Sequence, residues 1–545
     1  KVLNYIKAEL TKEELALVEE VFGKLPEGEV DAPHPAIGRV ISGFVSHKSP
    51  INLDEYSVEE IISHLKTDWS PKVLKDQFQN DDFLNPRGAE GLADALKENF
   101  RVRMFEYFPL LNKFFDRESI DASYVYALLR QMEDYLRAGQ KFDDDQITAV
   151  FTFLDLIRVS GEKVEFKRSD ERSYLADWIA VHKVSTDLLV DILRAVGNGP
   201  LFKANRGRVL SIIKYLLTVK SSPDPEDDKR EAEEPFHIAV NSVRGRAYES
   251  FIQFTNADGP KLAEDIKAIF LSVLDNEQSN AVRFVMGHYI ATLYFKDIDF
   301  IRGLAPRIFP NTQQKDRLSF ASWEGYLANA LYKELYEEFK DYYAYAITLS
   351  QKDYPNRKYL KGLDETLAGH LALAYAHFGL APGTALFDAF WNTPNESRHY
   401  EFTSFLGRHY LTKDTAGDKW FEDNKVDKQK LIDFWDWLLT TDIEVETKVF
   451  SGFGFWVNPE KEIIPDSILI EKLALTLPKS NGEIDWDYGL SRRIDKFAKI
   501  NPQRTLEIIE SLLILNGEIN PHHRMYYGTT HEVKGPLEAI YKIDQ

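Results

Sequence analysis

Apolar side chains recur at helical spacing along most of this chain. The segment from Tyr56 to Lys66 shows the pattern best, because its apolar residues stand at positions i, i+3, i+4 and i+7, which share one face of a helix. Ser57 lies just before this stripe and Glu60 follows three residues later, the arrangement of a capping box at a helix start. The pattern predicts an amphipathic helix with one buried face.

Further segments before residue 220 show the same periodicity. The predicted helices are Thr11 to Phe22, Gly91 to Asn99, Tyr124 to Ala138, Asp145 to Val159, Leu175 to His182, Thr186 to Ala195, and Val209 to Val219. Strict alternation of apolar and polar residues is rare, and it predicts short strands only at Val164 to Phe166 and Lys448 to Trp456. The chain is therefore predicted to be all-α.

A degenerate repeat appears after residue 236. Val243 and Arg244 recur 39 residues later as Val282 and Arg283, and a further predicted helix, Leu262 to Leu274, lies between them. The segment from Tyr326 to Tyr332 then resembles the segment from His288 to Tyr294, 38 residues earlier. A period near 40 with two helices per unit is typical of HEAT and armadillo repeats. The pattern predicts an α-solenoid of HEAT/TPR-like helical pairs.

One segment differs from the rest in composition. Residues 221 to 235 read SSPDPEDDKREAEEP, with three prolines and only one apolar side chain, Ala232. Such a segment cannot bury enough apolar surface to fold by itself, so we expect an acidic linker or loop. The predicted organisation is an N-terminal helical region (1–220), this acidic linker (221–235), HEAT-like repeats (236–350) and a C-terminal helical region (351–545).

Composition narrows the functional classes. The 545 residues include 67 Lys and Arg against 87 Asp and Glu, a net charge of −20, and no cysteine. A strongly acidic surface repels nucleic-acid phosphates, so no nucleic-acid partner is expected. No apolar stretch approaches the roughly 18 residues needed to span a bilayer, so no membrane partner is expected either. The absence of cysteine excludes thiolate chemistry and suits a cytoplasmic protein.

Catalytic and cofactor motifs are weak throughout. The glycine-rich segments at Gly197 to Pro200 and Gly452 to Gly454 lack the lysine and hydroxyl of a phosphate-binding loop. Asp485 and Asp487 flank Trp486, but acidic residues are too abundant for one pair to indicate catalysis. We therefore expect that this chain has no enzymatic activity. We assign no catalytic, cofactor-binding or metal-ligating residue, and we expect no cofactor.

Two groups of histidines are candidate metal ligands. His370 and His377 share a helix face, and a second group gathers near the C-terminus at His522, His523, His531 and Glu532. Neither has the spacing of a known zinc motif, so histidines with structural hydrogen bonds are the favoured interpretation. The C-terminal group leaves open the hypothesis that the chain is an enzyme without a recognisable motif.

Aromatic residues are dense in three places, namely Phe434 to Trp437, Phe453 to Trp456, and Tyr342 to Tyr345. Core packing of helical pairs is the favoured interpretation. The alternative is recognition of a protein, since exposed Trp and Tyr dominate binding hot spots.

Several segments together resemble a helical region of large bacterial STAND-type ATPases, including antiviral proteins of the Avs group. They keep the order found in that family and span roughly residues 80 to 515. The segments are Phe83 to Ala93, Phe105 to Phe115, Tyr124 to Leu129, Asn241 to Ala247, Trp323 to Leu327, His370 to Tyr375, Gly452 to Val457, and Gly482 to Asp487.

The resemblance implies a sensor. In such proteins an effector domain and a STAND ATPase precede a C-terminal helical-repeat region, which binds a viral protein such as a terminase or portal and thereby triggers oligomerisation. The expected partner is a phage protein, with oligomerisation through domains that this chain lacks. Because the first residue is Lys1, we expect the chain to be part of a longer protein. The alternative is a helical-repeat interaction scaffold with no viral role.

Structural roles are expected for several residues in these segments. Arg244 and Arg246, at the start of an apolar helix, are expected to brace neighbouring repeats through carboxylates or helix C-termini. Gly245 is expected to permit close helix approach. Gly452 and Gly454 are expected to shape a turn that packs Trp456. The residues that contact the partner are not predicted.

Overall fold

The computed structural model describes residues 47–78, 86–116, 118–161, 175–219, 234–276, 278–311, 316–349, 362–412, 417–515 and 518–519. This part of the chain is helical apart from one pair of two-residue strands, which confirms the predicted all-α class. The finer assignment to a HEAT/TPR-like solenoid stays a prediction. The predicted helix at Thr11 to Phe22, the predicted strand at Val164 to Phe166 and nearly all of the acidic linker lie outside the described residues.

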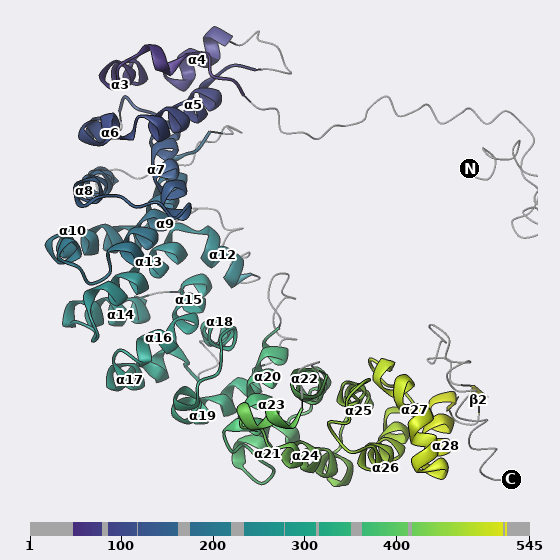
Figure 1. The fold of residues 1–545 in the computed structure, drawn as a ribbon. Coiled ribbons are helices and arrows are strands. Elements are labelled where there is room, and N and C mark those ends of the chain that lie inside the picture. Colours follow the sequence, from purple (N-terminus) through teal and green to yellow (C-terminus); the bar gives the residue numbers. More distant parts are fainter. Residues whose placement is uncertain are drawn as a thin grey trace, which may run out of the picture.

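The helices follow one another along a curved body that is open on one side (Figure 1). One row of helices lines the inner side of the curve, and each member contacts the next one in the row. This inner row consists of α5 (Ala89–Val102), α7 (Ala122–Arg137), α9 (Trp178–Val196), α13 (Val243–Asp258), α15 (Asn280–His288), α18 (Asp316–Leu327), α20 (Leu363–His377), α22 (Glu396–Leu406) and α25 (Thr447–Ser451).

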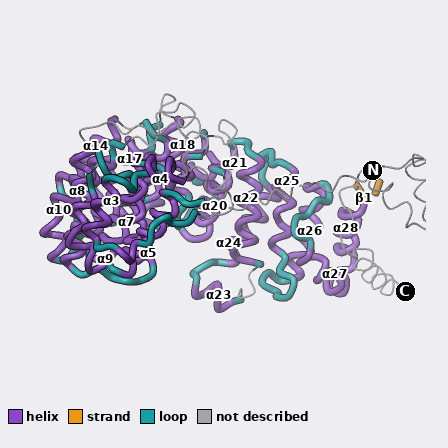
Figure 2. The backbone as a smooth tube through the Cα atoms, turned by 90° about the horizontal axis from the view of Figure 1, so that it is seen from above, coloured by secondary structure: helices purple, strands orange, loops and turns teal. Residues whose placement is uncertain are grey.

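A second row lies on the outer side of the curve (Figure 1). It consists of α8 (Asp144–Gly161), α10 (Pro200–Leu216), α14 (Glu264–Asn276), α17 (Ile298–Ile308), α19 (Lys333–Thr348), α21 (Ala385–Asn392), α24 (Lys428–Thr440), α26 (Asp466–Thr476) and α28 (Pro502–Leu513). Seen from above, the C-terminal helices extend as an arm away from the N-terminal part (Figure 2). One connected set of buried apolar side chains runs between the rows from Leu53 to Leu512.

The remaining elements complete the described part of the chain. They are η2 (Leu53–Glu55), α3 (Val58–Lys66), α4 (Pro71–Phe78), α6 (Met104–Tyr107), η3 (Phe108–Phe114), α12 (Pro235–Asn241), α16 (Ile290–Tyr294), the π-helical turn η6 (Gly407–Leu411), α23 (Asp418–Asp423), η7 (Gly452–Trp456), η8 (Leu477–Ser480), α27 (Tyr488–Ile500), and the strands β1 (Ile514–Leu515) and β2 (Glu518–Ile519). The two strands pair antiparallel, with Ile514 opposite Ile519.

Local sequence signals explain why many of these helices begin where they do. The predicted capping box is present at α3, where Ser57 Oγ accepts from the Glu60 N–H and the Glu60 carboxylate accepts from the Ser57 N–H. Ser242 and Ser279 cap α13 and α15 from the N-cap position, where each hydroxyl accepts from the backbone N–H three residues later. Each cap satisfies a backbone donor that would otherwise have no partner at the helix end.

One helix replaces two that were predicted. The segments at Leu175 to His182 and Thr186 to Ala195 belong largely to the single helix α9, so the predicted break is wrong. The hydroxyls between them do not interrupt the helix, because Ser185 Oγ donates to the Val181 carbonyl and Thr186 Oγ1 donates to the Lys183 carbonyl. Such back-bonding lets Ser and Thr remain inside a helix.

The predicted strand at Lys448 to Trp456 is also wrong, because the segment forms α25 and the tight helical turn η7. The aromatic spacing explains the difference. Phe450, Phe453 and Trp456 are three residues apart and are all buried. Side chains at i and i+3 are eclipsed in a 3₁₀ helix, so this spacing places them on one face.

The repeat region matches the prediction in part. The helices α13 and α15 are neighbours in the inner row, and the predicted helix at Leu262 to Leu274 is found as α14 between them. The third unit differs, because α18 ends at Leu327 and the residues up to Tyr332 follow that helix.

Glycines bring the inner helices into backbone contact. A Cβ atom on Gly287 would lie 2.0 Å from the Ser322 carbonyl oxygen, and one on Gly325 would lie 2.0 Å from the Phe284 carbonyl oxygen. The obstructing atoms are backbone, so they cannot move aside as the end of a side chain would. Helices α15 and α18 therefore cross at a distance that only glycine permits on each side.

We predict that Gly325→Ala weakens this crossing. The added methyl group overpacks the interface, which costs about 1–3 kcal/mol, and native-state hydrogen exchange of the α15 and α18 amides should show this loss. Gly303→Ala is the matched control, because no atom lies within 4 Å of its added Cβ inside α17. The control should stabilise its helix by up to about 1 kcal/mol. Equal exchange in the two variants would contradict the proposed close contact.

Candidate protein-binding surface

The segment between η8 and α27 has an unusual backbone. Asn481, Gly482 and Trp486 have φ values of 54°, 75° and 51°, all in the left-handed region. Glycine and asparagine adopt this conformation readily, but a bulky aromatic residue does so only when its surroundings hold it there. The contacts that hold Trp486 therefore define a candidate site.

Asp485 anchors this segment onto the inner row. Its backbone N–H donates to the Ser451 carbonyl at 3.0 Å, and its carboxylate accepts from Ser451 Oγ at 2.7 Å and from Lys448 Nζ at 2.9 Å. Burial raises the pKa of Asp485, but the hydrogen bonds from Ser451, Lys448 and Tyr400 outweigh it, so its pKa is lowered overall. The carboxylate is thus ionised when it ties the segment to α25.

Two glycines provide the seat beneath the segment. A Cβ on Gly454 would lie 1.7 Å from the Asp485 carbonyl oxygen, and one on Gly489 would lie 1.9 Å from the Val457 carbonyl oxygen. The backbone of the segment and the first turn of α27 therefore lie directly on η7. Gly454 therefore contacts the Asp485 backbone, whereas Gly407 faces the Trp456 ring, since a Cβ on Gly407 would lie 2.7 Å from Trp456 Cδ1.

This seat presents three aromatic rings, which we call the aromatic platform: Phe455, Trp486 and Tyr488. The Phe455 and Trp486 rings are stacked, with centroids 5.8 Å apart and planes inclined by 10°, and Tyr488 lies 6.2 Å from Trp486. Trp486 is 37% exposed and Tyr488 is 44% exposed. The platform is therefore a solvent-facing surface, carried by elements at the inner side of the C-terminal arm (Figure 1).

Two arginines flank the platform. The guanidinium carbon of Arg408 lies 5.2 Å from the centre of the Phe455 ring, and that of Arg492 lies 5.2 Å from the centre of the Tyr488 ring. Arg408 also donates to both carboxylate oxygens of Glu401 at 2.8 Å, which fixes its position. Trp, Tyr and Arg are the residues that most often dominate protein-binding hot spots. The platform can therefore recognise a protein through apolar area and cationic hydrogen-bond donors.

The two histidines on α20, His370 and His377, have different hydrogen-bond partners. His370 is buried, donates from Nε2 to the Asn329 carbonyl at 3.0 Å and accepts at Nδ1 from the Tyr343 hydroxyl at 3.0 Å. His377 instead contacts the Tyr410 hydroxyl at 2.8 Å. Seven helical residues separate the two by about 10 Å, so they do not share a ligand. Both nitrogens of His370 have structural partners, as the favoured interpretation held.

Metal-ligand clusters are also absent elsewhere in the described ranges, where no group of three His, Asp or Glu residues is placed to hold an ion. The group at His522, His523, His531 and Glu532 lies outside the described residues. Gly197 ends α9 with a φ of 51°, and Pro200 is the first residue of α10. That glycine-rich segment is a helix-to-helix turn.

The two arginines at the start of α13 differ: Arg246 has the carboxylate partner that was expected for bracing, whereas Arg244 lies near a tyrosine of its own helix. Arg246 forms an ion pair with Asp187 of α9, which joins two members of the inner row. Arg244 lies near the buried Tyr248 hydroxyl, whose pKa is raised by burial and lowered by this charge. Gly245 permits close approach as expected, because its Cβ would lie 2.1 Å from the Ala239 carbonyl oxygen.

The dense aromatic segments mainly build the core. Trp435 and Phe453 are fully buried and stacked, with ring centres 4.2 Å apart, and Tyr343 is fully buried as well. Phe455 belongs to the segment Phe453 to Trp456, for which recognition was the alternative interpretation, but the exposure of Trp486 and Tyr488 was not predicted. In the sequence Trp486 lies between two aspartates and within the segment Gly482 to Asp487, and nothing in the local pattern indicates that Arg408 meets Phe455. The available signal was the pair of glycines, Gly482 and Gly489, that enclose Trp486 and Tyr488.

We predict that His370 makes stability fall with acidification. Burial lowers its pKa to about 4, while the unfolded chain gains this proton near pH 6.5. The stabilising contribution of neutral His370 is therefore complete above about pH 6.5 and is lost as the pH falls toward 4, by up to about 3 kcal/mol.

Urea denaturation between pH 7 and pH 4 measures this loss. His370→Gln, which retains a donor and an acceptor, should flatten the profile relative to the unsubstituted protein. His377→Gln is the control, because His377 is more exposed and should change the profile less. Superimposable profiles for all three proteins would show that His370 does not carry the effect.

In comparisons with known proteins, no family model matches this chain, and neither a curated protein nor a solved structure matches it.

Proposed function

We propose that this chain is a HEAT/TPR-like helical solenoid that recognises a folded protein, and that it is the sensor portion of an antiviral STAND-type ATPase. The aromatic platform is the observation that carries the recognition role. A partly exposed Trp486, held in a left-handed backbone by the partly buried Asp485 carboxylate and two glycines, is costly to maintain for packing alone.

The arrangement of helices supports the same role. Stacked helical pairs offer a long concave surface, which suits a large folded ligand better than a short peptide. The two rows and the open curve of the chain are consistent with such a surface (Figure 1). The viral identity of the ligand rests on the family resemblance of segments such as Gly452 to Val457 and Gly482 to Asp487. These two segments contribute Phe455 and Trp486 to the platform and Gly454 to the contact beneath it.

The ligand is expected to meet the platform with a mixed apolar and acidic surface. Phe455, Trp486 and Tyr488 supply apolar area, while Arg408 and Arg492 supply donors at its edges. In the described residues no helix is long and apolar enough to cross a membrane. Binding in this proposal needs no catalytic step from the chain itself, because activation would lie in an ATPase and an effector that precede it.

We predict that Trp486→Asn uncouples binding from folding. Asparagine tolerates the left-handed conformation, so relief of backbone strain, of about 1–2 kcal/mol, offsets the lost stacking on Phe455. Unfolding should change by less than about 1 kcal/mol, while affinity for the partner should fall at least tenfold, as for a hot-spot residue.

Biolayer interferometry against purified phage portal and terminase proteins provides the measurement. The matched control is Leu475→Ala, which removes a 50% exposed side chain from α26 outside the platform. If Trp486→Asn and Leu475→Ala bind equally well, the platform is not the recognition surface. If no phage structural or packaging protein binds, but a cellular protein crosslinks at Trp486, the chain is an interaction scaffold with no viral role.

A further inference from the structure

A second solvent-facing apolar surface lies where α16, α17 and α19 meet. It comprises Phe295, Ile298 and Tyr332, which are 52%, 44% and 46% exposed. The Phe295 and Tyr332 rings touch edge to face with centroids 5.6 Å apart, and Tyr294 packs against Phe295 at the same distance. These residues come from two separate parts of the chain, so the fold assembles the surface.

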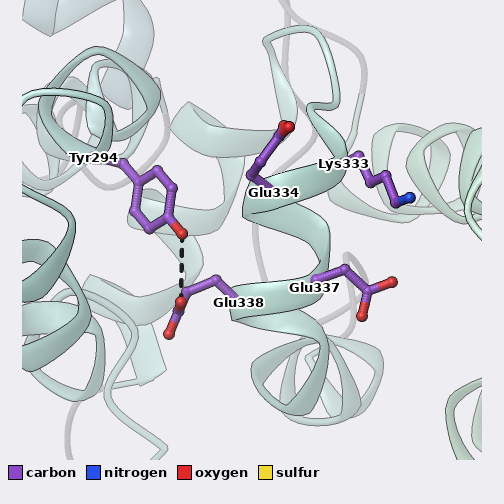
Figure 3. Close-up of a pocket in the computed structure, with 5 residues that line it drawn as sticks. All are labelled: Tyr294, Lys333, Glu334, Glu337 and Glu338. Atoms are coloured by element: carbon purple, nitrogen blue, oxygen red, sulfur yellow. Dashed lines mark hydrogen bonds between the residues drawn. The ribbon is translucent and has the colours of Figure 1, made fainter.

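A hollow of about 500 Å³ lies beside Tyr294 (Figure 3). It is lined by Tyr294 of α16 and by four residues in the first turns of α19: Lys333, Glu334, Glu337 and Glu338. The Tyr294 hydroxyl points at the Glu338 carboxylate, 3.4 Å away, whereas the Lys333 side chain extends away from Tyr294 (Figure 3). The lining is therefore aromatic on one wall and net negative on the other.

The three glutamates differ in how they are compensated. Arg302 of α17 donates to both oxygens of Glu338 at 2.8 Å, and this hydrogen bonding lowers the pKa of that carboxyl. Glu337 has an exposed ion pair with Lys340 at 3.1 Å, which contributes little in water. Glu334 and Glu337 are exposed and lie three residues apart on the same helix, so their field extends into the hollow.

We propose that this surface docks a basic segment of a protein partner, with a lysine or arginine side chain entering the hollow. The cation would lie against the rings of Tyr294 and Tyr332 and in the field of Glu334 and Glu337, while its aliphatic stem covers Phe295. Aromatic faces and carboxylates are the two groups that bind a desolvated ammonium or guanidinium.

Charge complementarity selects this occupant. A nucleic acid or an acidic peptide would bring negative charge against the exposed Glu334 and Glu337 and against a chain whose net charge is −20. The surface is distinct from the aromatic platform, which is flanked by arginines and belongs to η7 and α27. The inference rests on the proposed function only in assigning the chain a protein partner.

Fluorescence anisotropy with a dye-labelled lysine–glycine repeat peptide tests the site directly. A glutamate–glycine repeat peptide is the probe of opposite charge. Binding of the lysine peptide should weaken about tenfold in Glu334→Gln/Glu337→Gln and in Tyr332→Ala, which remove the carboxylates and the exposed ring respectively. It should also weaken as salt rises, because exposed charges are screened.

The matched control is Asp144→Asn/Asp145→Asn, which removes the same charge from exposed positions of α8. An equal loss in this control would show attraction to net charge alone and would overturn the docking site. Absence of binding by the lysine peptide, or tighter binding of the glutamate peptide, would overturn it as well. Circular dichroism of each variant confirms that the helices are retained.

The lysine-peptide experiment tests the hollow independently of the experiment that tests the platform. Trp486→Asn should leave binding of the lysine peptide unchanged, since the platform and the hollow share no residue. If phage proteins fail to bind while the lysine peptide binds at the hollow, the viral role fails and the docking site stands. If phage proteins bind and the lysine peptide does not, the reverse holds.

Discussion

Buried cations that close the ends of helices are the constraint on which the two-row arrangement depends. Stacking two rows buries the last carbonyls of many helices, and these have no partner within their own helix. Arg283 of α15, only 1% exposed, donates to the Leu274 carbonyl at the end of α14 and to the Arg307 carbonyl at the end of α17, both at 2.9 Å. One guanidinium thereby joins three helices and opposes the negative ends of two of them.

The same device recurs along the body. Arg398 of α22 donates to the Ile347 carbonyl at the end of α19 and pairs with Asp364 of α20. The partly buried Lys296 donates to the Thr255 carbonyl in the last turn of α13, and its partial burial lowers its pKa. A buried cation without such partners would be costly, so each of these residues fixes the position of a helix end rather than adding a general attraction. The glycine crossings then set how closely the inner helices approach.

Sequence reasoning captured the features that local chemistry determines. The apolar stripe of α3 and its Ser57 cap, and the helix between α13 and α15, follow from local spacing. The bracing role of Arg246 was also predicted, although its partner Asp187, 59 residues away, was not. Prediction failed where a distant contact decides the outcome. A helix was predicted to start at Thr186, but its hydroxyl donates to a carbonyl within α9 and the helix continues. A strand was predicted near Phe453, but the aromatic residues there are three apart, and Phe453 packs against Trp435. Exposure of Trp486 could not be predicted, because it depends on how Asp485 meets Ser451, 34 residues away.

The net charge of the chain does not predict which partner each surface favours, because the local charge differs between the two surfaces. A total of −20 alone favours a basic partner everywhere on the chain, yet the platform carries Arg408 and Arg492 beside its rings and so favours the opposite sign. The hollow at Tyr294 is lined by the exposed Glu334 and Glu337, beside a Glu338 that is paired with Arg302, and it favours a cation. The two surfaces also belong to different rows, since η7 and α27 lie by the inner helices and α17 and α19 lie in the outer row (Figure 1). A partner that fits one surface is therefore mismatched at the other in both sign and position, so the chain discriminates by repulsion as well as by contact.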